Sequence, residues 1–127
     1  MKLRIRGNSI RLRLDQKDVK VFKEQWYLEQ SIQFGIGAGG KLTYVIATAD
    51  IPKLKSEYKE NMIKVWVPKK LAYDWVNSQI VGMEHLATTS DDTKLKILVE
   101  KDFKCLQVRI NEDESKSFPH PKEKGKT

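Results

Sequence analysis

Arginine is the residue type whose placement in this chain most clearly points to chemistry. Four of the five arginines lie within the first 13 residues, as Arg4, Arg6, Arg11 and Arg13. Alternate residues of a strand point to the same side, so this spacing places the four side chains together on one face of a two-stranded ribbon. Guanidinium groups bind phosphate or carboxylate through a planar fork of donors. The sequence therefore predicts an anion-binding face, with Asn8 in the turn of the ribbon.

The distribution of charge supports this prediction. The net charge is +7, and the first 23 residues hold eight basic and two acidic residues, so nearly all of the excess is N-terminal. Nucleic acid is the partner that such a face favours, because neutralised phosphates release counterions and a β-ribbon fits the major groove. The alternative is a solvated face whose arginines pair with acids from elsewhere in the fold, such as Glu24, Glu29 or residues 112–114.

No convincing catalytic or metal site emerges from the sequence. Cys105 is the single cysteine, His85 and His120 are the only histidines, and their spacing matches no zinc motif. Glu100 and Asp102 share a face of a predicted strand, but the lysines at 101 and 104 favour a solvated edge. We therefore expect a protein that is not an enzyme and that holds no metal or other cofactor.

The glycine-rich segment Gly35–Gly40 resembles a phosphate-binding loop in composition only. A phosphate loop needs a helix N-terminus behind it, whereas residues 41–45 have the β-branched and aromatic character of a strand. We predict a hairpin connection at this place.

Hydrophobic periodicity predicts the order ββαββ for the first half of the chain. Asp15 is the expected N-cap of the helix, which runs to about Trp26. The expected strands cover residues 2–6, 9–14, 27–34 and 41–49.

The same order is predicted again at an offset of 53 residues. The second unit has strands at 55–59, 62–67, 80–86 and 94–100 and a helix at 69–77, with Pro68 at its start. Few residues are identical at this offset, so the prediction rests on the order of elements. The two repeats would span residues 1–50 and 54–103.

Length and composition indicate one domain with a C-terminal tail. The chain of 127 residues can bury one modest core, which we assign to residues 1–110. Residues 111–127 are poor in apolar residues and are predicted to be irregular or disordered, with Phe118 as a candidate contact for a protein partner. The sequence has no long apolar run and a lone cysteine, so we expect a cytoplasmic protein without a membrane partner. Its oligomeric state stays open.

Residues 4–14, followed by a helix and a hairpin ending in Gly40-Lys41-Leu42, resemble the MazE/AbrB swapped-hairpin group of bacterial DNA-binding domains. In that group basic residues of a ribbon with a Gly-Asn-Ser turn contact DNA, and two copies interleave into one barrel. The resemblance implies that Arg4, Asn8 and Arg13 occupy the basic and turn positions. Ile5 and Asp15 depart from the group's pattern, whereas Pro68 restores its strand-Pro-helix order in the second unit.

The whole chain resembles a small bacterial protein family of unknown function. The segments that carry this resemblance are residues 7–14, residues 100–106 and Phe118-Pro119-His120-Pro121. The resemblance implies a bacterial domain and no particular activity.

These observations predict an α+β fold in which two ββαββ units pack as an internal pseudo-dimer, with Trp26, Trp66 and Trp75 adding bulk. The preferred function is a nucleic-acid-binding or antitoxin-like regulatory domain that contacts DNA through residues 4–13. The alternative is a non-enzymatic interaction module that binds an acidic or apolar protein partner.

Overall fold

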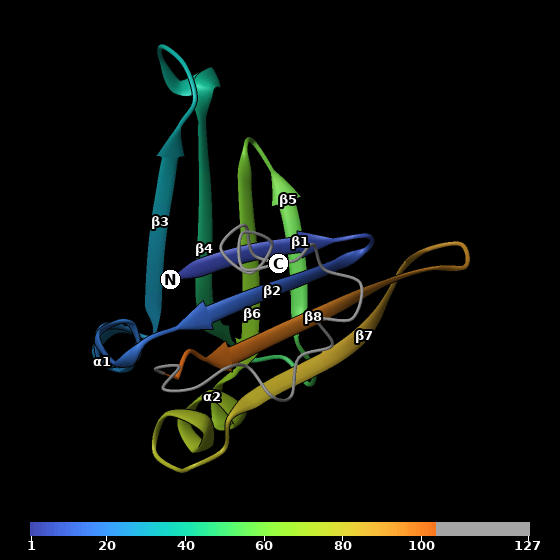
Figure 1. Cartoon of the computed structure of the whole chain (residues 1–127). Coiled ribbons are helices and arrows are strands. Elements are labelled where there is room, and N and C mark those ends of the chain that lie inside the picture. The colour runs from blue at the N-terminus through green and yellow to red at the C-terminus, as the bar shows by residue number, and fades with distance from the viewer. Residues whose placement is uncertain (104–127) are drawn as a thin grey trace, which may run out of the picture.

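The computed structural model describes residues 1–103 (Figure 1). The predictions for residues 111–127, including Phe118, lie outside the described residues. Within them the chain forms two α-helices, eight strands and one short 3-10 turn at Ala38–Gly40. In chain order these elements are β1 (Lys2–Arg6), β2 (Ser9–Leu14), α1 (Gln16–Gln25), β3 (Tyr27–Gln33), β4 (Lys41–Ala49), β5 (Lys55–Lys59), β6 (Met62–Pro68), α2 (Lys69–Val76), β7 (Gly82–Ser90) and β8 (Thr93–Lys101).

Local sequence signals account for the boundaries of these elements. Gly7 adopts a positive φ of 54° in the β1–β2 turn, and Asn61 has a φ of 60° in the β5–β6 turn, as tight hairpin turns require. Asp15 caps α1 through a capping box: its side chain accepts a hydrogen bond from the Asp18 N–H (2.8 Å), and the Asp18 side chain accepts one from the Asp15 N–H (3.0 Å). Pro68 lies one residue before the first helical residue of α2.

The two ββαββ units are interleaved, because each sheet takes one hairpin from each unit. Sheet A has the strand order β1-β2-β8-β7, and sheet B has the order β3-β4-β6-β5. The two units meet at the centre of each sheet, where β2 pairs with β8 and β4 pairs with β6, both in parallel. The fold is the expected α+β pseudo-dimer, and neither sheet belongs to one unit alone.

The strand registers show how closely the two units correspond. Ser9 lies opposite Lys96 in sheet A, and a shift of 53 turns this pair into Met62 opposite Thr43 in sheet B. The hairpins β1–β2 and β5–β6 also correspond at an offset of 53. Strand β7 corresponds to β3 at an offset of 55, since the register of the β7–β8 hairpin differs by two residues. The second unit therefore carries two extra residues between its helix and its third strand.

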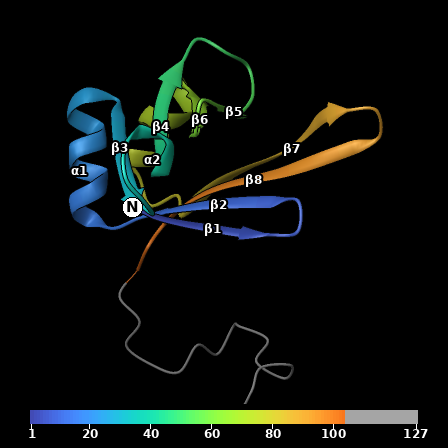
Figure 2. The same cartoon turned by 90° about the horizontal axis from the view of Figure 1, so that it is seen from above.

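The core lies between the two sheets and is closed at one end by the helices (Figure 2). Phe22 of α1 and Trp75 of α2 occupy equivalent positions, are fully buried, and have ring centroids 6.4 Å apart. Trp26 packs on Phe22 at 5.5 Å. The expectation that Trp66 adds bulk to the core is wrong. The alternation of β6 places Trp66 on the outer face of sheet B, beneath the ammonium group of Lys64.

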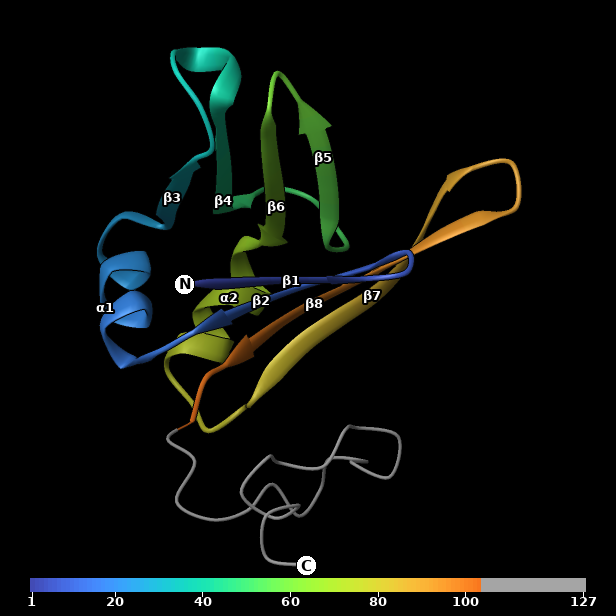
Figure 3. The same cartoon turned by 45° about the horizontal axis from the view of Figure 1, so that its top comes forward.

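The end of the molecule away from the helices is open. The hairpins of the two sheets run in different directions there, so that their turns diverge (Figure 3). Three apolar residues on the inner faces of the sheets are accordingly exposed, namely Ile5, Ile32 and Tyr58.

Candidate nucleic-acid interface

The β1–β2 hairpin places the four predicted arginines on the outer face of sheet A. Arg4 lies directly opposite Arg11, while Arg13 faces Lys2 and Arg6 faces Ser9. Leu12 and Leu14, which alternate with the arginines of β2, are fully buried on the inner face. The alternation that forms the core thus brings the basic side chains together, as the sequence predicts.

Strand β8 adds an acidic edge to this face. Arg11 and Arg13 of β2 pair with Leu98 and Glu100 of β8, and Asp102 follows the end of that strand. The Arg11 Nε lies 3.1 Å from Glu100 Oε1, and the Arg13 Nη2 lies 3.2 Å from Asp102 Oδ1. The acids that pair with the ribbon are therefore Glu100 of β8 and Asp102 just after it, and neither Glu24 nor Glu29 forms an ion pair among the described residues.

Asp102 is the most strongly engaged of these acids. Lys2 Nζ approaches its Oδ2 to 2.9 Å, while Arg13 contacts its other oxygen. The hydrogen bond from Lys2, assisted by the positive charge of Arg13, holds the pKa of Asp102 below its ordinary value. The Arg13 Nε is buried and has no hydrogen-bond partner among residues 1–103. Two carboxylates thus hold three cations at the α1 end of the ribbon.

The other end of the ribbon keeps its positive charge. Arg4 and Arg6 are exposed and form no ion pair with any residue that the structure describes. Lys96 lies beside Ser9 on β8, and Lys94 follows two residues away on the same face. The sequence did not predict these two lysines at the ribbon, because only the β2–β8 pairing brings them next to the arginines. The four cations form a patch around the β1–β2 turn, which we call the basic tip (Arg4, Arg6, Lys94 and Lys96).

Asn8 contributes to this tip by fixing the turn. The side-chain amide of Asn8 donates a hydrogen bond to the backbone carbonyl of Lys94. The backbone carbonyl of Asn8 accepts a hydrogen bond from the Lys96 N–H at 3.1 Å. Asn61 makes the equivalent backbone bond with Thr43 in the second unit, at 3.0 Å. Asn8 therefore ties the β1–β2 turn to β8 and sets the position of the neighbouring lysines.

The outer face of sheet B has a different character. Lys64 and Trp66 occupy the positions equivalent to Arg11 and Arg13, with the ammonium group 4.7 Å from the ring centroid. Ala47 takes the place of Glu100 beside Trp66 and is nearly buried. Glu57 stands at the position of Arg4. The same framework thus carries the arginine ribbon on one sheet and, on the other, a mixed face in which Trp66 lies among lysines and Glu57.

The remaining residues with reactive side chains do not form a site among the described residues. His85 lies half-buried on the inner face of β7, opposite Ile97. Within residues 1–103 no cluster of three histidine, cysteine or acidic side chains is arranged to hold a metal ion. Cys105, His120 and Phe118 fall in the part of the chain that the structure does not describe. The segment Gly35–Gly40 connects β3 with β4, as expected, and a strand follows it.

Neither helix in the described range has the length and apolar character needed to cross a bilayer.

Comparison with known proteins finds no match among curated proteins or solved structures. The resemblance to the MazE/AbrB group is therefore not confirmed. The model of DUF7009, a family of unknown function, matches residues 1–122. On this match the chain belongs to the DUF7009 family.

Proposed function

We propose that this protein is a nucleic-acid-binding regulatory domain that contacts the phosphate backbone through the outer face of sheet A. The observation that carries the proposal is the basic tip, in which Arg4 and Arg6 are exposed and unpaired within the described chain. Four cations that form no ion pair within the described chain are available to phosphates, and each contact releases counterions from the nucleic acid.

The ion pairs at the other end of the face support a directional contact. Glu100 and Asp102 offset two of the three positive charges of Arg11, Arg13 and Lys2, so the positive potential increases toward the β1–β2 turn. A duplex would approach the tip first, since like-charged carboxylates disfavour phosphates at the far end. Because β2 pairs with β8 inside a four-stranded sheet, the contact that we propose is made with the phosphate backbone by the outer face of the sheet.

Fluorescence anisotropy with a labelled mixed-sequence duplex, titrated with salt, tests the proposal. We expect log Kd to rise linearly with log salt, and the double variant Arg4→Ala/Arg6→Ala to lower the slope by about 2, one unit for each lost phosphate contact. The matched control is Lys55→Ala/Lys59→Ala at the edge of sheet B, which removes the same charge from exposed positions. If the slope fell equally in both variants, net charge alone would account for the binding and the basic tip would have no special role.

Absence of binding at low salt would overturn the proposal and favour the second candidate, a protein-interaction module. One observation supports that candidate: apolar side chains are exposed on the β3–β4 connection and at the open end of the molecule.

A further inference from the structure

The connection between β3 and β4 exposes apolar side chains to an unusual degree. Residues 30–40 contain no charged residue, although nearly a third of the whole chain is charged. Within this stretch Phe34 is 73% exposed, Ile36 is fully exposed and Ile32 is half-exposed. Exposed apolar side chains that are contiguous along a projecting loop mark an interaction site more often than a solvated turn.

Hydrogen bonds brace this loop from inside. The Gln33 side chain donates to the carbonyl oxygens of Gly35 (2.6 Å) and Gly37 (2.9 Å), and the Phe34 N–H donates to the Gly40 carbonyl (2.6 Å). A Cβ on Gly40 would lie 2.8 Å from the Gly35 backbone, so only glycine allows this closure. The loop therefore presents Phe34 and Ile36 on a closed frame, which lowers the entropy lost on binding.

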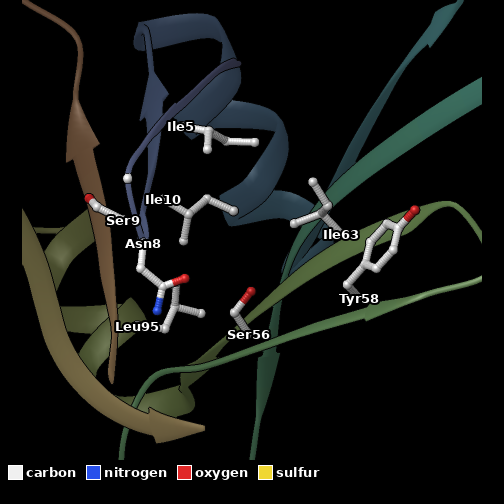
Figure 4. A pocket seen from close by; sticks show the side chains of 9 residues that line it. Ile5, Asn8, Ser9, Ile10, Ser56, Tyr58, Ile63 and Leu95 are labelled. Atoms are coloured by element: carbon white, nitrogen blue, oxygen red, sulfur yellow. The ribbon is translucent and has the colours of Figure 1, made fainter. Parts of the chain in front are cut away.

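A hollow that is uncharged and largely apolar, like the loop, lies between the two sheets at the open end of the molecule. It has a volume of about 200 Å³ and is lined by residues of β1, β2, β5, β6 and β8, none of them charged. Ile5 and Ile10 of sheet A point toward Ile63 of sheet B across it (Figure 4). Ile5 and Tyr58 are equivalent in the two units and are 62% and 68% exposed. No described residue covers this surface.

We propose that a second copy of this chain occupies the hollow, with the loop around Phe34 and Ile36 of each copy inserted into the hollow of the other. One aromatic or branched side chain is of a size to enter a hollow of this volume. Burying the loop and the two exposed rim residues would remove roughly 600 Å² from each copy, which brings the interface to the lower end of the range for stable dimers. Neither surface carries a charge that insertion would have to desolvate.

Sedimentation equilibrium of the full chain tests this interface independently of nucleic-acid binding. The wild type is expected to form a dimer whose dissociation constant rises by roughly 100-fold or more in Phe34→Ser/Ile36→Ser and in Ile5→Ser/Tyr58→Ser. The control Tyr73→Ser removes a side chain of similar exposure from α2 and should leave the dimer unchanged. Circular dichroism verifies that each variant keeps its fold.

Mixing the two double variants gives a sharper result. The loop variant keeps an intact hollow and the hollow variant keeps an intact loop, so the mixture can form one of the two insertions. We expect partial recovery of association in the mixture and none in either variant alone. A wild type that stays monomeric up to about 0.5 mM, or a dimer that survives the loop substitutions, would overturn the proposal. A dimer lost in Phe118→Ser but kept in the loop variant would assign the contact to the tail and also overturn it.

Discussion

The acids of β8 offer the most discriminating test of how the basic face works. Glu100 and Asp102 hold Arg11, Arg13 and Lys2 in three ion pairs with separations of 2.9 to 3.2 Å. A phosphate that contacts these cations must compete with the carboxylates. The double variant Glu100→Gln/Asp102→Asn keeps the shape of both side chains and removes this competition, so it should bind nucleic acid more tightly than the wild type.

The structure sets the size of this gain. All three ion pairs are partly exposed, so each contributes only about 0.5 kcal/mol after solvent screening. A phosphate contact in the wild type forfeits that energy and also meets two like charges within a Debye length. Removing both costs strengthens binding by roughly 1 to 2 kcal/mol, or about tenfold in Kd at low salt. The salt slope should rise by up to about 2.7 if all three released cations find phosphates.

Anisotropy titrations of the wild type and the variant with the same duplex measure both quantities. The control Glu24→Gln/Glu57→Gln makes the same change in net charge on α1 and on the outer face of sheet B, away from the ribbon. An affinity that is unchanged in Glu100→Gln/Asp102→Asn, or that increases equally in the control, would refute the argument that these acids mask the ribbon.

Three further predictions concern the fold. In a double-mutant cycle monitored by urea unfolding, Phe22→Leu and Trp75→Leu should show a coupling energy of about 1 kcal/mol, because the two rings touch at the junction of the units; strict additivity would contradict this contact. Asp15→Ala should lower the free energy of unfolding and the urea midpoint, since the Asp18 N–H loses its acceptor, whereas Lys20→Ala at an exposed position of the same helix should have little effect. The lowered pKa of Asp102 means that its ion pairs stabilise the folded state above about pH 4 and that this contribution is lost as the pH falls through the lowered pKa. The difference in unfolding free energy between wild type and Asp102→Asn should therefore shrink below pH 4, and a constant difference from pH 7 to pH 2 would argue against the role of the ion pairs.

The elements of this fold were predictable because each one carries a local signal. Alternation of apolar residues defines the strands, Gly7 and Asn61 mark the tight turns, and the Asp15 capping box and Pro68 mark the helix starts. These signals depend on neighbours within a few residues. The β7 strand was the least accurately placed, at 80–86 instead of Gly82–Ser90, because the prediction carried the offset of 53 over from β3, whereas the second unit has two extra residues before this strand.

The partners of the hairpins were beyond the reach of the same signals. Alternation decides which face of a strand is buried and does not specify the distant strand that pairs with it. The pairing of β2 with β8 joins residues almost ninety positions apart, and it determines that Glu100 and Asp102 meet the ribbon. One clue was present in the sequence: the two acids are spaced by two residues, as are Arg11 and Arg13, so the two strands can match charge for charge when they run in parallel.

The presence of both units in one chain explains how the two outer faces can differ. Two identical chains with interleaved hairpins would present the same residues on both sheets, because each position would occur twice. Here Arg13 beside Glu100 in sheet A corresponds to Trp66 beside Ala47 in sheet B, with the strand register preserved. The framework is preserved by the buried positions, where equivalent residues of the two units have the same character: Leu12 corresponds to Val65, and Phe22 corresponds to Trp75. A single chain therefore keeps the symmetric core while it places all four arginines of the described residues on one face, so the contact that we propose with nucleic acid is one-sided.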